Sequence, residues 1–325
     1  MNINHLFQLF ENTKVLVLGD VMIDAYFSGV VTRISPEAPV PIVNLRNKEQ
    51  RLGGAANVAL NLKSLGAEPI ICAVKGNDSD GNRLKELCEK EGLVTHALIT
   101  DHSRRTTVKT RIIGNNHQLL RIDEEDTQEI EKNVEDSVYR AVHSLVGQVD
   151  VLILQDYNKG LLSPTLITKV IQLCKEHNVP TVVDPKFNNF YEYQGVTLFK
   201  PNKKELTQAE NITEKIGLEE IKKLAAIVRE KLGAQGIMTT LSEDGVLIDT
   251  AEETVHKPAH PRKIVDVSGA GDSVLSVAAL CVAANVSNEL TAALANLAGG
   301  IVCEQVGVVP IDKAVLLSEA SELTA

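Results

Sequence analysis

Short apolar runs alternate with longer amphipathic stretches along most of this chain. The runs are continuously apolar, which is typical of strands buried on both faces of a parallel sheet. They are Val15–Leu18, Ile70–Val74, Val151–Leu154, Thr181–Val183, Val196–Phe199 and Gly236–Leu241. The stretches with helical periodicity are Gly54–Leu65, Asp80–Glu91, Thr127–Val146, Pro164–His177, Leu218–Leu232, Gly269–Asn285 and Glu289–Glu304. The alternation predicts an α/β fold with a doubly wound, mostly parallel sheet flanked by helices.

Two regions depart from this alternation and predict a second, smaller sheet. Pro39–Arg46 reads as extended and carries prolines, which belong on edge strands because proline has no N–H to donate. Gly114–His117 is a turn cluster between two short strand-like segments, which is a hairpin pattern. We expect these pieces, from about residues 24–46 and 104–123, to form a small β lid inserted into one domain.

Composition bounds the class of protein. The chain has 325 residues, of which 44% are hydrophobic and 23% charged, so it is globular and not disordered. One α/β domain of this size is allowed, and we expect a single domain over residues 1–325. No apolar run reaches the ~18–20 residues that span a bilayer, and the first residues lack a basic start and an apolar core. We therefore expect a cytoplasmic protein with no membrane segment and no secretory signal.

Charge and cysteine content exclude further classes. The formal net charge of −10 argues against nucleic acid or an anionic membrane as partner. Aromatic residues make up 3% of the chain, too few for base-stacking platforms. The five cysteines are an odd number without a CxxC pair, so we expect reduced, buried thiols and no zinc site or disulfide framework.

The motif Asp266-Val-Ser-Gly-Ala-Gly-Asp272 precedes an Ala-rich helical stretch. At Gly269, Ala270 and Gly271 the backbone N–H groups can converge without obstruction, and the start of a helix adds positive potential. This pattern indicates an anion hole suited to a phosphoryl group. Asp272 then lies in the first helical turn, where a carboxylate can take the proton of a substrate hydroxyl. The alternative is a glycine-rich turn in which Asp272 only stabilises the helix start.

A second cluster of small residues opens another helix. Gly53 and Gly54 allow close approach of the backbone to a ligand, and Asn57 offers both a donor and an acceptor. Asp24, just past the first strand, can accept hydrogen bonds from sugar hydroxyls. Tight helix–sheet packing and a turn or cap role are the alternatives. Neither GxxxxGK[ST] nor a GxGxxG after the first strand occurs, which disfavours a P-loop NTPase and a dinucleotide oxidoreductase.

The two clusters together resemble the paired signatures of the ribokinase-like (PfkB-type) carbohydrate kinases. Pro201-Asn-Lys-Lys-Glu205 resembles the PNxxE motif of that family, and Asp184-Pro-Lys186 resembles its DPxx segment. Thr239–Gly245 resembles the nucleotide-side turn. The resemblance covers roughly residues 12–312. It implies in-line transfer of a phosphoryl group from ATP to a sugar hydroxyl, with Asp272 as the general base.

The resemblance also implies a set of binding residues. ATP and Mg²⁺ are the implied cofactors, and Asn202 and Glu205 lie near the metal, mostly through water. The other implied ATP contacts are Thr240, Gly245 and, in the last Ala-rich stretch, Asn296. The implied contacts to sugar hydroxyls are Asp24, Gly53, Gly54 and Asn57.

A closer resemblance is to the subgroup that phosphorylates D-glycero-β-D-manno-heptose 7-phosphate. Arg33–Pro41 and Asp156-Tyr-Asn-Lys-Gly160 carry it, whereas Gln155 departs from it. The implied reaction phosphorylates the C1 hydroxyl to give the 1,7-bisphosphate, a step toward ADP-heptose and the lipopolysaccharide core. The 325 residues include no HxGH motif, so we expect the following nucleotidyl transfer to be carried out by another protein.

A phosphorylated sugar needs cations in the site. Our candidates are Lys109 and Arg111, which are two apart and so share one face of a strand, and Lys186 in a cleft motif. Each of them is otherwise an ordinary surface charge. The resemblance further implies a homodimer formed through the lid.

Two other functions stay open. One is a kinase of the same family that acts on another sugar, sugar phosphate or nucleoside. The other is a sugar-binding protein that kept the fold and lost catalysis, which the intact Asp272 and glycine pair disfavour.

Overall fold

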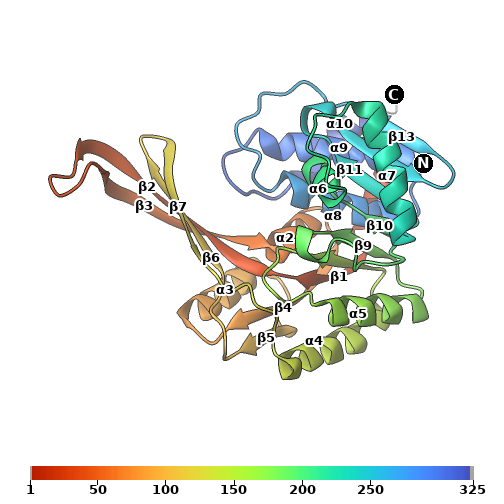
Figure 1. Ribbon diagram of the computed structural model, residues 1–325, viewed down its shortest axis with the longest axis horizontal. Helices are drawn as coiled ribbons and strands as arrows, with labels where there is room; N and C mark the ends of the chain where they lie inside the picture. Colours follow the sequence, from red (N-terminus) through yellow and green to blue (C-terminus); the bar gives the residue numbers. More distant parts are fainter. Residues whose placement is uncertain (1, 323–325) are drawn as a thin grey trace.

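The computed structural model describes residues 2–322. Within this range the body of the protein is built on a sheet of nine strands in the order β13-β12-β11-β10-β9-β8-β1-β4-β5 (Figure 1). The strands are β1 (Lys14–Gly19), β4 (Glu68–Gly76), β5 (Leu98–Asp101), β8 (Val151–Gln155), β9 (Thr181–Asp184), β10 (Leu198–Phe199), β11 (Gly236–Thr240), β12 (Val246–Thr250) and β13 (Thr254–Lys257). Neighbours from β5 to β11 pair in parallel, and only β12 and β13 are antiparallel. The predicted mostly parallel sheet is confirmed.

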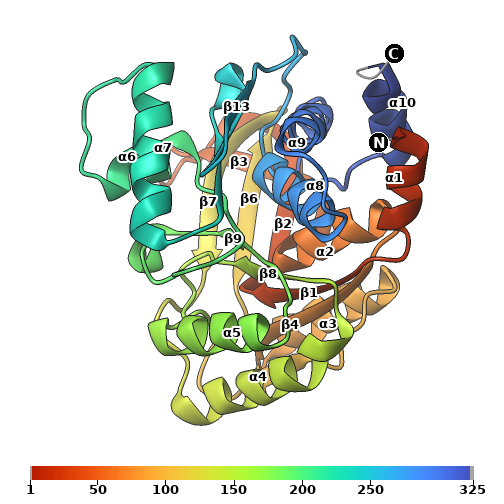
Figure 2. The same ribbon diagram turned by 90° about the vertical axis from the view of Figure 1, so that its right-hand side faces the viewer.

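Helices cover both faces of this sheet (Figure 2). One face packs against α1 (Ile3–Phe10), α2 (Ala55–Ser64), α3 (Ser79–Lys90), α8 (Ala270–Ala283), α9 (Asn288–Cys303) and α10 (Lys313–Glu322). The other packs against α4 (Lys132–Leu145), α5 (Pro164–Glu176), α6 (Lys203–Ala209) and α7 (Leu218–Leu232). In β1, Val15 and Val17 point to the first core, whereas Leu16 and Leu18 point to the second. This two-sided burial is the reason for the continuous apolar runs.

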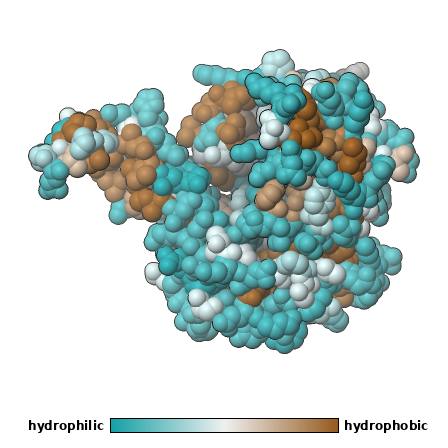
Figure 3. All heavy atoms as spheres, in the orientation of Figure 1, coloured by the Kyte–Doolittle hydropathy of each residue, from teal (hydrophilic) through white to brown (hydrophobic). Residues whose placement is uncertain are grey.

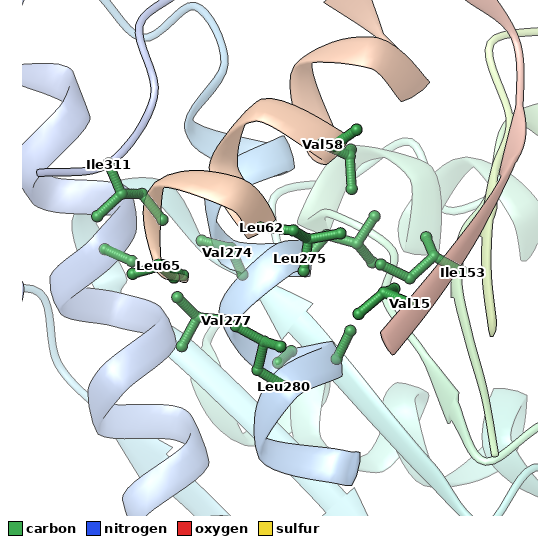
Figure 4. Close-up of a cluster of buried hydrophobic side chains, with 14 of the residues drawn as sticks. Val15, Val58, Leu62, Leu65, Ile153, Val274, Leu275, Val277, Leu280 and Ile311 are labelled. Carbon is green, nitrogen blue, oxygen red and sulfur yellow. The ribbon is translucent and has the colours of Figure 1, made fainter. Parts of the chain in front are cut away.

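The first core holds α2 and α8 against the centre of the sheet. Figure 4 shows Leu62 of α2 and Leu275 of α8 together with Val15 of β1 and Ile153 of β8. All four side chains are fully buried. Burying an aliphatic side chain of this size stabilises the fold by about 1.5–3 kcal/mol. These contacts hold α2 and α8 against β1 and β8.

A second sheet extends from the body as an arm (Figure 1). Its strand order is β3-β2-β6-β7, and we call it the arm sheet. It consists of β2 (Val21–Ile34), β3 (Pro41–Gly54), β6 (Val108–Gly114) and β7 (His117–Glu124). The predicted hairpin and edge strand are present, but β2 and β3 run further than the predicted segments. They pair from Val21 opposite Gly54 to Ile34 opposite Pro41, so that the arm leaves β1 and returns directly into α2.

Two predicted elements differ from the observed ones. The helix expected from Thr127 starts only at Lys132, because the Ile130 amide donates to the Gly160 carbonyl at 3.0 Å instead of joining a helix. The strand expected over Val196–Phe199 forms only at Leu198–Phe199. The sequence pattern also missed β5, β12, β13 and the three helices α1, α6 and α10.

The strand order reverses beside β1, which lies between β4 and β8. Open α/β sheets bind ligands in the crevice at such a point, outside the carboxyl ends of the strands. Gly19 is opposite Gln155 there, and the Asp20 amide donates to the Gln155 carbonyl at 3.1 Å. The chain segments that follow β1 and β8 therefore meet at one place.

Two further expectations concern membranes and thiols. Among residues 2–322, none of the helices combines the length and the apolarity needed to cross a membrane. The five cysteines are free and buried, as expected. Burial raises the pKa of the Cys72 thiol to about 12, which disfavours a reactive thiolate.

Candidate active site

Asp272 lies in the first turn of α8, and its side chain is buried. The helix is preceded by Gly269 with φ +83°, a left-handed conformation that glycine adopts without strain. No side chain among the described residues caps this helix start. The Ala270 amide donates to the Val267 carbonyl at 3.3 Å. The motif therefore forms a helix N-terminus without a side-chain cap, which favours anions.

Three side chains donate hydrogen bonds to the Asp272 carboxylate. The Asn57 amide lies 2.6 Å from Oδ2, the Tyr157 hydroxyl 3.0 Å from Oδ1 and the Gln155 amide 3.2 Å from Oδ1. Burial raises the pKa of Asp272 to about 6, and the hydrogen bond from Asn57 opposes this shift. Gln155, the residue that departs from the subgroup pattern, is thus one of the donors that hold this carboxylate.

A buried pair of charges lies on the other side of Gln155. Its amide is 3.4 Å from Asp184 Oδ2, and Lys200 Nζ is 3.1 Å from Asp184 Oδ1. Lys200 is 2% exposed, so its ammonium needs this partner. A Cβ on Gly271 would lie 3.9 Å from Lys200 Nζ. A buried cation therefore adjoins the start of α8.

Lys186 connects this region with the PNxxE motif. Its Nζ lies 2.7 Å from Glu205 Oε1 and 5.4 Å from the centroid of the Tyr157 ring. Burial lowers the pKa of Lys186, but Asp184 and Glu205 outweigh this effect and raise it, so Lys186 is a fixed cation. Lys186, Tyr157 and Asp272 thus form a continuous row of contacts.

Asn202 and Glu205 form a capping box at the start of α6. Asn202 Oδ1 accepts a hydrogen bond from the backbone N–H of Glu205, and Glu205 Oε2 accepts one from the backbone N–H of Asn202, both at 2.9 Å. Thr240 is bridged to Asn202 at the end of β11. The two other predicted ATP contacts do not join this group: Gly245 forms the turn before β12, and Asn296 donates to the Pro258 carbonyl at 2.8 Å.

The residues predicted to bind sugar hydroxyls meet at the base of the arm sheet. Asp24 is 4% exposed and forms an ion pair with Arg111. Gly53 faces the Asp24 carboxylate so closely that a Cβ there would collide with it. Gly54 has φ +59° and packs against the Asp20 carbonyl, which brings the start of α2 and hence Asn57 toward Asp272.

Asp20 organises the loop after β8, although sequence analysis did not single it out. Its Oδ2 accepts from the Tyr157 amide at 2.8 Å and the Lys159 amide at 3.1 Å. Burial and the neighbouring Asp156 charge raise the pKa of Asp20 to about 6. This carboxylate sets the position of Tyr157, and therefore of one donor to Asp272.

Lys109 shares a strand face with Arg111, as predicted, but it already has anionic partners. Its Nζ lies 2.9 Å from Asp123 Oδ2 and 2.7 Å from Glu125 Oε2. Lys109 is opposite Asp24 in the β2–β6 register. It therefore belongs to the same face of the arm sheet as the candidate sugar contacts.

Comparison with known proteins agrees with this geometry. Residues 12–314 match the model of the pfkB family carbohydrate kinases. The chain belongs to this family. It is 41% identical over 315 residues to the "Bifunctional protein HldE" of Desulfatibacillum aliphaticivorans and 39% identical over 318 residues to that of Caulobacter vibrioides. These matches cover 97% and 98% of this chain but only 64% and 65% of the relatives, so the chain spans less than two thirds of their length.

Solved structures share the fold of this carbohydrate kinase. Escherichia coli phosphofructokinase-2 in complex with fructose-6-phosphate has a TM-score of 0.80 at 18% identity and covers 97% of this chain and 99% of that chain. Arabidopsis thaliana ribokinase complexed with ribose and ATP has a TM-score of 0.71 at 17% identity and covers 94% and 99%. As a member of this family, the protein is a phosphotransferase that uses ATP and acts on a sugar hydroxyl.

The residues predicted from the sequence lie at the two ends of this candidate site, and sequence reasoning missed several residues between them. Tyr157 and Asp184 stood inside motifs that were noted for the resemblance, and Gln155 was noted only as a departure. Asp20 and Lys200 carried no signal beyond their places at the end of one strand and before the PNxxE motif. A cavity of about 410 Å³ next to β5 and the start of α4 contains none of the predicted residues.

Replacing Asp272 by asparagine is expected to change how stability depends on pH. The folded state holds the Asp272 proton more tightly than the unfolded chain, because the pKa is about 6 and not 3.8. The Asp272 carboxyl group therefore lowers the free energy of unfolding as pH rises from about 4 through 6. Asparagine does not titrate, so the Asp272→Asn variant does not lose this stability. From about pH 4 to pH 8 the variant should gain about 2–3 kcal/mol relative to the wild type in urea unfolding.

The exposed Asp244 provides the matched control. The difference between Asp244→Asn and the wild type should vary by less than about 0.5 kcal/mol over the same range. A pH-independent difference for Asp272→Asn would contradict the raised pKa.

Proposed function

We propose that this chain transfers the γ-phosphoryl group of ATP to the C1 hydroxyl of D-glycero-β-D-manno-heptose 7-phosphate. The product is the 1,7-bisphosphate, on the route to ADP-heptose and the lipopolysaccharide core. The observation that carries the chemistry is Asp272, a buried carboxylate at an uncapped helix start. The choice of sugar is supported by the resemblance of Arg33–Pro41 and Asp156–Gly160 to the heptose kinase subgroup. The similarity to HldE proteins over nearly the whole chain also supports it.

Asp272 acts as the general base in this proposal. It accepts the proton of the C1 hydroxyl as the sugar oxygen forms its bond to the γ-phosphorus, and the bond from that phosphorus to the bridging oxygen of ADP breaks. The donors on Asp272 hold the carboxylate in one orientation, with Asn57 on one oxygen and Tyr157 on the other. A pKa near 6 leaves it ionised at neutral pH yet more basic than an ordinary aspartate.

Charge on the moving phosphoryl group is stabilised at the start of α8. The Gly269 and Gly271 amides and the helix dipole face this charge, whereas the Ala270 amide of the predicted anion hole is already engaged with the Val267 carbonyl. Lys186 and Lys200 add two ammonium groups on the same side of the site, and burial of Lys200 strengthens its effect. Lys186 is also a candidate contact to the substrate. It lies against the ring of Tyr157, whose hydroxyl donates to Asp272.

The residues near the implied Mg²⁺ fit an indirect role. Both Glu205 carboxylate oxygens and the Asn202 amide oxygen are engaged in the capping box and the Lys186 pair. They can therefore order water around a metal more readily than they can coordinate it. Mg²⁺ bound with ATP supplies charge neutralisation of the phosphates.

A substrate panel tests the proposal. In coupled ADP release, turnover should be confined to heptose 7-phosphate and absent with unphosphorylated heptose, fructose 6-phosphate, fructose and ribose. Asp272→Asn should lower kcat by about 10²–10⁴-fold, the usual contribution of a general base. The control is Glu252→Gln, which changes an exposed carboxylate in the turn between β12 and β13 and should leave kcat unchanged. Turnover on a different sugar, a different sugar phosphate or a nucleoside would overturn the heptose assignment. The family membership would still stand.

The pH profile tests the role of Tyr157. Asp272 works as the carboxylate, so kcat/KM should fall as pH drops through about 6. The Tyr157 hydroxyl donates to the charged form and lowers its pKa, so Tyr157→Phe should move this acidic limb to higher pH. Tyr193→Phe is the matched control, because it removes a buried hydroxyl that donates to Asp156 at 2.8 Å and not to Asp272. An unmoved limb in Tyr157→Phe would contradict the assignment.

We also propose that the protein is a homodimer joined through the arm sheet. The edges of this sheet are β3 and β7, and edge strands need cover. Leu120 and Ile122 of β7 are 56% and 45% exposed, and Figure 3 shows apolar side chains gathered on the arm. These side chains point away from the face that carries Asp24 and Lys109.

Charge on this apolar face should separate the dimer. In sedimentation equilibrium the wild type should have twice the mass of the chain, and the double variant Leu120→Lys/Ile122→Lys should have the mass of one chain. Ile227→Lys on α7 is the control, since Ile227 is similarly exposed on the body and should not affect the mass. A double variant with the same mass as the wild type would show that dimerisation does not use this face.

A further inference from the structure

A chain of alternating charges crosses the arm sheet and ends on the body. Arg121 Nε lies 2.8 Å from Asp123 Oδ1, and Lys109 Nζ lies 2.9 Å from Asp123 Oδ2. Glu125 follows, with Oε2 at 2.7 Å from Lys109 and Oε1 at 2.8 Å from Lys159. Lys159 belongs to the loop after β8, so Glu125 links the arm sheet to the body.

Glu125 is unusual in this row because each of its oxygens binds a different lysine ammonium group, and both lysines are largely shielded from solvent. The side chains of Lys109 and Lys159 are 14% and 13% exposed, and that of Glu125 is 20% exposed. Burial opposes ionisation, but the two lysines hold the pKa of Glu125 below its usual range. Two cations that converge on one anion form a site for any anion that can replace it. Lysine suits phosphate here, since its three donors rotate around a point charge.

This pair of lysines lies beside the candidate sugar contacts at the base of the arm sheet. Lys109 is next to Asp24 in the arm sheet, and Asp24 is a candidate contact to sugar hydroxyls. The Lys159 amide and the Tyr157 amide bind the same oxygen of Asp20, while the Tyr157 hydroxyl binds Asp272. One short loop therefore connects the candidate base to the two-lysine site.

We propose that Glu125 occupies the place of the substrate's distal phosphate between Lys109 and Lys159, and that the phosphate displaces it on binding. This rests on the proposed function, in which the sugar carries a phosphate far from the reacting hydroxyl. A phosphate dianion replaces the single charge of the carboxylate and offers more oxygens to the two lysines. A neutral sugar cannot replace Glu125, because Lys159 would lose its carboxylate partner and Lys109 would keep only Asp123. Glu125 is thus a specificity-determining residue, and its release opens the link between arm and body.

Direct binding of inorganic phosphate tests this without any turnover. Isothermal titration of the full chain with inorganic phosphate should show about 10-fold tighter binding to Glu125→Gln than to the wild type, because the competing anion is gone. Lys159→Gln should weaken binding in both backgrounds, which separates this site from phosphate bound near α8. Glu124→Gln is the matched control, since Glu124 is exposed and alternates to the opposite face of the strand.

A second variant guards against misfolding of the first. Glu125→Asp keeps the charge but is one methylene shorter, so it cannot span both lysines and should also bind phosphate more tightly than the wild type. Unchanged or weaker phosphate binding in a folded Glu125→Gln or Glu125→Asp protein overturns the proposal.

Kinetics separate this proposal from the proposed function. With the phosphorylated sugar, Glu125→Gln should lower KM by about 10-fold at unchanged kcat, and Glu124→Gln should leave both unchanged. If the protein turns over heptose 7-phosphate but Glu125→Gln alters neither its KM nor phosphate affinity, the displacement is wrong and the kinase assignment stands. If no phosphorylated sugar is turned over while Glu125→Gln binds phosphate more tightly, the anion site stands and the heptose assignment fails.

Discussion

A carboxylate removed from water at the start of α8 imposes the main constraint on this structure. An ionised aspartate is costly to bury unless hydrogen bonds satisfy it. Asp272 obtains them from Asn57 of α2, from Gln155 at the end of β8 and from Tyr157 in the following loop. Because these donors come from separate elements, the packing of α2 and α8 on β1 and β8 has to be accurate. The aliphatic core in Figure 4 provides that accuracy.

The opposing contributions to the Asp272 pKa bring an ordinary side chain into the range that the proposed general base requires. Burial and the nearby Asp184 carboxylate raise the pKa, whereas the hydrogen bonds and the Lys200 charge lower it. The balance lies near 6, within reach of neutral pH. The cost is a group that destabilises the fold at the pH where it is useful, which is common at functional sites.

One loop coordinates the two ends of the site. Asp20 accepts hydrogen bonds from the backbone N–H groups of Tyr157 and Lys159 in the loop after β8. It thereby positions the Tyr157 hydroxyl at one end of the site and Lys159 at the other. Asp20 itself follows β1, at the point where the strand order reverses. The arm sheet starts from the same place, since β2 begins at Val21. The body and the arm therefore both border the place where the strand order reverses.

The sequence by itself determined the central alternation of strands and helices, the second sheet and the two glycine-rich helix starts, but not the short elements β5, β12, β13, α1, α6 and α10. These are local properties: the periodicity of Leu218–Leu232 predicts α7 with its observed bounds, and the motif around Gly269 marks the start of α8. Tertiary structure alone decided that Ile130 pairs with Gly160 instead of extending α4, and that Gln155 is a donor to Asp272. It also decided that Lys109 forms ion pairs with Asp123 and Glu125. In the sequence alone, Lys109 is only a cation on a strand. The physical reason is that such partners lie far apart in the chain, and packing, not local pattern, selects which of them meet.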